Sequence, residues 1–319
     1  MRIGYPCINL SLTCRPSRTF RLASYSEERL CETLANNLAC LEEIIYWNAV
    51  HDLLFLRITS DLVPFGSHPA NQYPWDQEFA PDFARIGEQI QGYGLRISMH
   101  PGQYTLLNSP RSKVLAASLA DLRYHARVLD LLGLDQTAKI QIHVGGLYGD
   151  KKAAMARFVQ RVNNLEQTVR DRLVVENDER FYTLEDALSI HAQCGIPVLL
   201  DTFHHELNPD GRSLREALAA AAATWSQKDG LPMVDYSSPL PKGRTGSHAY
   251  SLNKAHFKRF LKESRPFDFD LMLEVKNKER SALLAAKIAA SDPRFVSTSS
   301  LIRLALMESR EKETPPNEE

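Results

Sequence analysis

The sequence lacks the features of disulfide-rich, secreted or membrane-spanning proteins. Its cysteines are few, odd in number and free of any CxxC pair: Cys7, Cys14, Cys31, Cys40 and Cys194. This pattern is typical of reduced thiols in a cytoplasm rather than of disulfides or a zinc ribbon. No run of about eighteen apolar residues occurs, and the N-terminus MRIGYPCINL has no signal-peptide stretch. We therefore expect a soluble, cytoplasmic protein.

The sequence also has no excess of charge of either sign. Its 38 Lys and Arg residues stand against 39 Asp and Glu residues, a formal net charge of −1. No overall positive field therefore attracts nucleic acid, and a polyanionic partner has to meet a local basic face. The 319 residues, 44% hydrophobic and 24% charged, are otherwise those of an ordinary globular protein.

Short apolar or β-branched runs alternate with amphipathic stretches along the chain. Strands are predicted at 2–5, 53–59, 95–99, 139–144, 173–176, 197–201, 233–236 and 271–275, and the clearest helices at 27–46, 115–132, 153–169, 184–194 and 214–225. This α/β alternation predicts a parallel sheet closed into a (β/α)8 TIM barrel, a single domain over residues 1–290. Residues 291–319 are predicted to form a C-terminal extension, largely a disordered tail, because ESREKETPPNEE is charged and aperiodic.

Polar residues stand at the carboxyl ends of seven predicted strands, where TIM barrels build their active sites. They are Tyr5, His100, His143, Glu176, Asp201, Asp235 and Glu274, and His204 and His248 follow nearby. Each one alone fits an N-cap or a turn equally well. Together, four carboxylates around one mouth repel one another unless cations neutralise them. The set predicts at least two divalent metal ions with a bridging carboxylate, as in metallophosphoesterases, although sugar isomerases have similar rims.

Basic residues follow the same strand ends. They are Arg15, Arg18, Arg21, Arg111, Lys113, Lys151, Lys152, Arg212, Lys242, Arg244, Lys276, Lys278 and Arg280. Any one of them is an ordinary solvated residue on its own. If all these loops surround the predicted mouth, they form a positive collar suited to a polyanionic substrate.

The segment HPGQYTLLNSP, residues 100–110, places Gln103 and Tyr104 after Gly102. A planar amide beside an aromatic ring can enter a base stack and replace the stacking that is lost when nucleotides are flipped out. A rim packing pair explains the same composition equally well.

Eight ordered blocks carry a family resemblance: RIGYPCINL, HPGQYTLLNSP, IHVGG, VVENDE, LLDTFHH, VDYSS, TGSHA and DLMLEVKNKE. Over residues 1–290 the chain resembles the UV damage endonuclease family, a barrel relative of endonuclease IV. The resemblance implies metal ligands at His100, His143, Glu176, Asp201, His204, His248 and Glu274. It also implies lesion-probing roles for Gln103 and Tyr104, with Tyr5 and Asn9 lining the pocket of the damaged nucleotides.

Two features depart from the family pattern. Some relatives carry Lys-x-His at the seventh strand, where this chain has Met233 and Asp235. Met233 cannot ligate a metal, whereas Asp235 offers a carboxylate ligand that favours a harder ion such as Mn²⁺ or Mg²⁺ over Zn²⁺. No carboxylate accompanies His248 in the sequence, so a third ion at His204 and His248 lacks a further protein ligand.

The resemblance implies a DNA repair endonuclease that cuts immediately 5′ to cyclobutane dimers and 6-4 photoproducts, and at abasic sites. Metal-activated water would attack phosphorus and leave 3′-hydroxyl and 5′-phosphate ends, with Glu176, Glu274, Asp201 and His143 as the catalytic residues. We expect two or three divalent ions per chain, Mn²⁺ first and Mg²⁺, Co²⁺ or Zn²⁺ as alternatives. The expected partner is double-stranded DNA with distorting lesions, bound by a monomer without a membrane or an obligate protein partner.

Two alternatives stay open. A metal-dependent sugar isomerase or epimerase on the same barrel requires a small closed pocket and no basic collar. A damage-binding protein without turnover is the second alternative, if methionine at position 233 disables the metal site.

Overall fold

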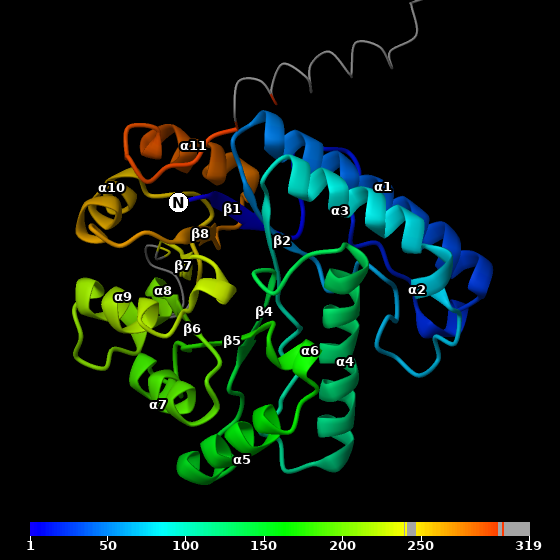
Figure 1. Cartoon of the computed structure of the whole chain (residues 1–319), viewed down its shortest axis with the longest axis horizontal. Helices are drawn as coiled ribbons and strands as arrows, with labels where there is room; N and C mark the ends of the chain where they lie inside the picture. Colours follow the sequence, from blue (N-terminus) through cyan, green and yellow to red (C-terminus); the bar gives the residue numbers. More distant parts are fainter. Residues whose placement is uncertain (239, 241–246, 299–301, 303–319) are drawn as a thin grey trace, which may run out of the picture.

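Eight parallel strands close into a barrel with helices outside it (Figure 1). This is the computed structural model of the chain, and it describes residues 1–238, 240, 247–298 and 302. The strands are β1 Ile3–Pro6, β2 Phe55–Ile58, β3 Arg96–Met99, β4 Lys139–His143, β5 Leu173–Glu176, β6 Val198–Asp201, β7 Met233–Tyr236 and β8 Asp270–Leu273. Each strand pairs with the next, and β8 pairs with β1. The predicted TIM barrel and all eight predicted strands are confirmed.

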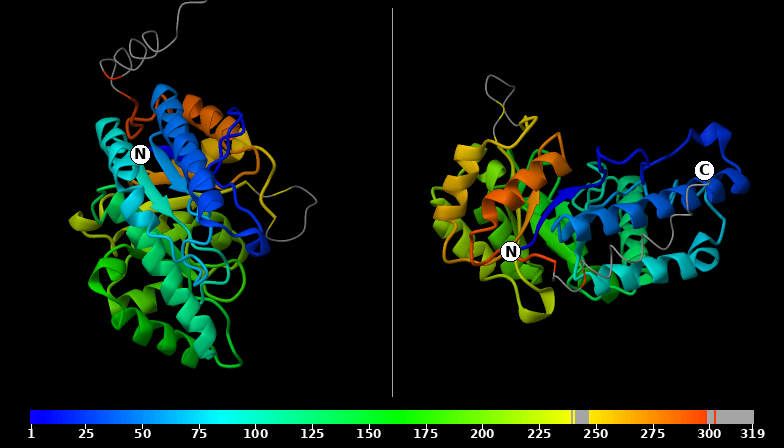
Figure 2. Two further views of the ribbon diagram at one scale, coloured as in Figure 1. Left: turned by 90° about the vertical axis from the view of Figure 1, so that its right-hand side faces the viewer. Right: turned by 90° about the horizontal axis from the view of Figure 1, so that it is seen from above.

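The helices of the described chain lie outside the strands. They are η1 Leu22–Ser24, α1 Glu27–Val50, α2 Trp75–Glu78, α3 Ala80–Gly92, α4 Ser112–Leu131, α5 Lys151–Asn163, α6 Gln167–Arg170, α7 Leu184–Cys194, α8 Thr202–Leu207, α9 Leu214–Ala222, η2 Gln227–Asp229, α10 Lys254–Glu263 and α11 Glu279–Ala289. Figure 2 shows α1 and α3 side by side on one flank of the barrel. The helix predicted over 153–169 is two helices, because the backbone at Glu166 is extended, with ψ at 141°.

An apolar plug fills the inside of the barrel. It consists of Phe55, Val174, Leu199, Met233 and Met272, all buried. Met233 therefore packs in the barrel core. The plug separates the carboxyl end of the barrel, which we call the mouth, from its amino end.

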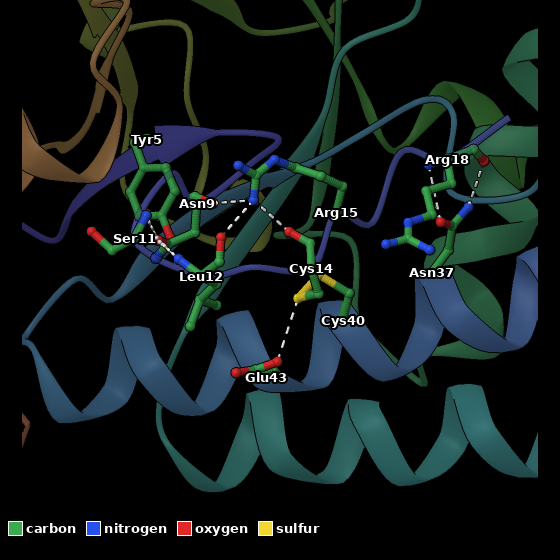
Figure 3. Close-up of a disulfide and its surroundings, with 10 residues drawn as sticks. All are labelled: Tyr5, Asn9, Ser11, Leu12, Cys14, Arg15, Arg18, Asn37, Cys40 and Glu43. Carbon is green, nitrogen blue, oxygen red and sulfur yellow. Dashed lines mark hydrogen bonds between the residues drawn. A yellow bond between two sulfur atoms is a disulfide. The ribbon is translucent and has the colours of Figure 1, made fainter.

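The expectation that all five cysteines are reduced is wrong for two of them. Cys14, in the loop after β1, forms a disulfide with Cys40 of α1, 26 residues further along the chain (Figure 3). The loop runs back along α1, where the Asn37 side chain accepts from the backbone N–H of Arg18 at 3.0 Å. This path brings Cys14 against the helix, and the spacing of the cysteines does not encode it. The three free cysteines are Cys7, Cys31 and Cys194.

The chain beyond α11 returns to the barrel as far as the structure describes it. The N–H of Val296 donates to the carbonyl oxygen of Met1 at 3.0 Å. The hydroxyl of Thr298 donates to the carbonyl oxygen of Ala49 at 2.6 Å. Most of the predicted tail, residues 299–301 and 303–319, lies outside the described residues. Among the described residues, every helix is too short or too polar to cross a membrane.

Candidate metal centre

Strand register brings the polar strand ends to one level at the mouth. His143 of β4 is paired with Glu176 of β5, and Asp201 of β6 with Asp235 of β7. Because parallel strands of a closed barrel end on the same rim, these side chains meet at the axis. His100 follows β3 and Glu274 follows β8, so both lie beside the same rim.

Three overlapping groups of ligand atoms form there. Within each group the atoms lie within 4.8 Å of one another: His100, His143 and Glu176; Glu176, Asp201 and His204; Asp201, Asp235 and Glu274. Glu176 and Asp201 each belong to two groups. This sharing is what a bridging carboxylate between neighbouring ions requires. Within the described chain His248 joins none of these groups, and its Nε2 lies 3.9 Å from Glu274 Oε2.

The spacing of Glu176 from His100 and His143 fits a metal ion better than direct hydrogen bonds. Its Oε2 lies 3.6 Å from His100 Nε2 and 3.5 Å from His143 Nε2. These distances are too long for good hydrogen bonds. Two ligands of one metal ion lie farther apart than two hydrogen-bonded atoms, because each is about 2 Å from the ion. Glu176 and the two imidazoles are therefore spaced as ligands of one cation.

Unpartnered carboxylate oxygens support a second ion. Asp201 Oδ1 accepts from the backbone N–H of His204 at 2.8 Å and caps α8, whereas Asp201 Oδ2 has no hydrogen-bond partner. Asp235 Oδ1 is buried without a partner as well. Buried polar atoms are rarely left unsatisfied, so these oxygens fit a cation between them. Asp201 is thus both an N-cap and a ligand candidate, two interpretations that the sequence presents as alternatives.

Sequence reasoning missed two polar side chains at the centre, Arg57 of β2 and Gln141 of β4. The Arg57 guanidinium forms ion pairs with Asp235, at 2.7 Å, and with Glu274. Gln141 Nε2 donates to Glu176 Oε2 and to Asp235 Oδ2, both at 2.6 Å. Arginine inside the buried strand FLRI was the available signal, since a charge there needs a partner.

Burial and charge set the protonation of the ligands without metal. Burial lowers the pKa of His100 to about 3, so its ring is neutral and ready to coordinate. Burial also raises the pKa of Asp201 to about 7. Burial raises the pKa of Glu274 too, but the Arg57 charge outweighs this and holds it at about 2. In Glu176 the opposing effect of His143 and His204 likewise wins, and its pKa is below the usual range.

His204 differs from the other imidazoles of the centre. Its burial lowers the pKa, but Asp201 and Glu176 outweigh burial and raise the pKa to about 11. Its Nδ1 lies 3.0 Å from the carbonyl oxygen of Asn177 and its Nε2 3.9 Å from Glu179 Oε2. Glu179 is thus a carboxylate near the predicted third-ion position, where the sequence interpretation found none.

Comparison with known proteins identifies the family. The model of the family described as UV-endonuclease UvdE matches residues 1–295. The chain belongs to this family. A UV DNA damage endonuclease of Clostridium perfringens (strain 13 / Type A) is 38% identical over 285 residues, which cover 89% of this chain and 69% of that protein.

Solved structures agree with this assignment. The crystal structure of SacUVDE has a TM-score of 0.87 and 41% identity, covering 91% of this chain and 98% of that chain. Endonuclease IV of Thermus thermophilus has a TM-score of 0.53 at 16% identity, over 97% of this chain and 100% of that one. The second likeness shows a shared barrel fold.

The family resemblance singles out Gln103 and Tyr104, and the structure places both on an exposed turn beyond His100. Tyr104 is 79% exposed, and no other large hydrophobic side chain of the described chain is more exposed. The turn is anchored behind its tip, where the hydroxyl of Thr105 donates to Asp121 at 2.6 Å. The pair therefore lies outside the ligand groups, on the surface beyond His100.

The other two residues singled out by the family resemblance, Tyr5 and Asn9, are buried. The Tyr5 hydroxyl donates to Asn48 Oδ1 at 2.7 Å and accepts from Asn9 Nδ2 at 2.9 Å. Asn9 Oδ1 accepts from the N–H of Ser11 at 2.8 Å. In this arrangement the two side chains brace the loop after β1, and their contact with nucleotides stays a prediction.

The predicted basic collar divides into paired and exposed members. Lys151 is paired with Asp186 and Arg212 with Glu185, each at 2.6 Å. Arg15 donates to backbone carbonyl oxygens of its own loop. Exposed members without an ion pair among the described residues are Arg18, Arg21, Arg111, Lys113, Lys152 and Lys276. Lys242 and Arg244 lie outside the described residues.

Proposed function

We propose that the protein cuts the DNA backbone immediately 5′ to cyclobutane dimers and 6-4 photoproducts, and at abasic sites. The products are a 3′-hydroxyl and a 5′-phosphate. One observation carries the proposal: in a chain of the UvdE family, Glu176 is shared by two groups of metal ligands at the barrel mouth. A shared carboxylate is the arrangement by which two ions act on one phosphodiester.

Two ions have candidate ligands among the described residues. His100, His143 and Glu176, one of the three groups, would hold the first ion. For the second ion we combine the group of Asp201, Asp235 and Glu274 with Glu176, which shares another group with Asp201. A third would lie at His204 and His248, with Glu179 as the nearby carboxylate. The excess of carboxylates over imidazoles at the second ion favours Mn²⁺, with Mg²⁺, Co²⁺ or Zn²⁺ as alternatives. When bound, such ions activate water and neutralise charge on the phosphate.

The chain's own residues prepare the centre for this chemistry. Glu176, Asp201, Glu274 and His143 are the proposed catalytic residues, because their ligand atoms would surround the reacting phosphate. His100 is neutral at physiological pH and therefore needs no proton loss before it coordinates. Asp201 Oδ1 is fixed by the N-terminus of α8, and its Oδ2 accepts no hydrogen bond and lies 3.5 Å from His204 Nδ1.

Lesion recognition is assigned to the exposed turn at Gln103 and Tyr104. A lesion weakens base stacking, so flipping the damaged nucleotides costs less there than in sound duplex. The amide and the ring then occupy the gap. Exposed cations at the start of α4, Arg111 and Lys113, would contact backbone phosphates of double-stranded DNA. The proposed unit of action is a monomer.

The test is incision of a duplex that carries one defined photoproduct. We expect no cut after treatment with EDTA, and a cut 5′ to the lesion after Mn²⁺ is restored. The double variant Gln103→Ala, Tyr104→Ala should lose incision and keep its metal content, whereas Gln193→Ala, an exposed glutamine of α7, should behave as the parent.

The other outcomes distinguish the alternatives. Absence of a metal-dependent cut would contradict the proposal. Tight binding of the photoproduct duplex without incision would favour a damage-binding protein, and isomerisation of a sugar without DNA cutting would favour a sugar isomerase or epimerase. Metal loss in the double variant would place the turn within the metal centre instead of beside it.

A further inference from the structure

Among the described residues, a buried arginine belongs to the centre. Arg57 is only 3% exposed and lies between the carboxylates of β7 and β8. Its Nη2 donates to Asp235 Oδ2 at 2.7 Å and to Gln141 Oε1 at 2.8 Å, and its Nη1 donates to Glu274 Oε1. A buried guanidinium with such fixed partners has little freedom to move toward a substrate.

These hydrogen bonds involve only one of the two oxygens of each carboxylate. Asp235 Oδ2 accepts from Arg57 and from Gln141, whereas Asp235 Oδ1 has no partner. Glu274 Oε1 accepts from Arg57, and Oε2 lies 3.9 Å from His248 Nε2, beyond hydrogen-bond distance. One oxygen of each carboxylate therefore stays available while the other is fixed.

The balance of charge at the mouth also indicates a role for Arg57. Glu176, Asp201, Asp235 and Glu274 place four carboxylates around the mouth, of which only Asp235 and Glu274 are ion-paired with an arginine of the described chain. Without a cation, such a cluster opposes folding through mutual repulsion and desolvation. The fixed guanidinium offsets part of this repulsion when metal is absent.

We infer that Arg57 is a positioning residue, which holds Asp235 and Glu274 as single-oxygen metal ligands and neutralises the carboxylate cluster in the metal-free protein. The inference rests on the proposed metal centre. Arg57 would act through the two carboxylates and would not touch the reacting phosphate. The presence of Arg57 also accounts for the aspartate at position 235, because the guanidinium compensates the negative charge that this residue adds to the carboxylate cluster.

Two variants separate the geometric from the electrostatic part. Arg57→Lys keeps the charge but cannot hold two carboxylates in a fork. We expect its Mn²⁺ affinity at the Asp201, Asp235 and Glu274 position to fall by about 10-fold to 100-fold, the usual effect of removing an outer partner of metal ligands. Arg57→Met removes the charge as well. Its melting temperature should fall most in the metal-free protein, and Mn²⁺ should restore more of it than in the parent.

Arg96→Met is the matched control. Arg96 lies on the neighbouring strand β3, is also buried, and is paired with Asp270 of β8 at 3.0 Å, but at the amino end of the barrel. Its loss should lower the melting temperature equally with and without Mn²⁺ and leave the metal content unchanged. The readouts are metal content by mass spectrometry, Mn²⁺ titration by calorimetry and thermal unfolding of the full chain.

The outcomes test the proposed metal centre and the proposed roles of Arg57 separately. If the parent protein binds no Mn²⁺, the proposed metal centre is wrong. If the parent binds Mn²⁺ and Arg57→Lys binds it equally tightly, only the positioning role is wrong. If Arg57→Met responds to Mn²⁺ no more than Arg96→Met does, the neutralising role is wrong. Should Arg57→Met not fold, the titration of Arg57→Lys still decides the positioning role.

Discussion

Both ends of the barrel interior contain buried carboxylates, but the two ends differ in how many of the carboxylate oxygens have partners within the chain. At the amino end, Asp270 accepts from Arg2 at one oxygen and from Arg96 at the other. Lys139 is paired with Asp229 at 2.6 Å. At the mouth, by contrast, one buried carboxylate oxygen of Asp201 and one of Asp235 accept no hydrogen bond. Buried charged groups that are paired within the chain stabilise the fold, whereas buried carboxylate oxygens that accept no hydrogen bond are available to a ligand.

The largest effect should come from the shared carboxylate of the mouth. Glu176→Gln keeps the shape but replaces a ligand oxygen of two groups with an amide. Removing one residue of a set that acts as a unit can cost about as much activity as removing the whole set. Incision of a photoproduct duplex should therefore fall by at least about 10³-fold, with loss of bound metal. Asp229→Asn, the same chemical change at the amino end, should keep the metal content. Full activity and metal content in Glu176→Gln would contradict the contrast between the ends.

The next effect concerns stability and belongs to the amino end. Asp270→Asn leaves the Arg96 and Arg2 guanidiniums without their charged partner. Breaking a buried ion pair on one side costs about 3–5 kcal/mol, which urea unfolding would measure. The exposed pair of Glu166 with Arg123 provides the control, since Glu166→Gln should cost less than about 1 kcal/mol. Metal content should not change in either variant, and a loss of metal in Asp270→Asn would show that the two ends are coupled.

The fold was accessible from the sequence because its signals are local and repeated. Apolar runs such as LVVE and VLLD end in a polar residue, and each coincides with a strand whose end lies at the mouth. Helix breaks are less visible. Glu166 follows Leu165 within an apparently continuous helical pattern, yet the backbone turns there.

What the sequence did not reveal depends on contacts between distant segments. The Cys14–Cys40 disulfide follows from the path of the loop after β1, which no spacing rule encodes. The ion pairs of Arg57 reach β7 and β8, 178 and 217 residues further along the chain. An arginine in a strand signals a buried charge, but its partners emerge only when the barrel closes. Glu179 shows the same limit, since its nearness to His204 depends on how the loop after β5 folds.

The smallest predicted effect concerns the proton of His204 at the mouth. The pKa of His204 is raised to about 11 by Asp201 and Glu176, which outweigh burial. The ring therefore carries a proton at neutral pH, and a metal ion that uses it has to displace that proton. Apparent Mn²⁺ affinity should then rise with pH, by about tenfold per pH unit for each proton displaced, between pH 6 and 8. Calorimetry in two buffers of different ionisation enthalpy measures the protons released. His204→Gln should release fewer, whereas His256→Gln, which removes an imidazole paired with Glu206 outside the centre, should release as many as the parent. Equal release by parent and His204→Gln would show that Mn²⁺ binds without His204 and would limit the metal centre to the ligands around Glu176 and Glu274.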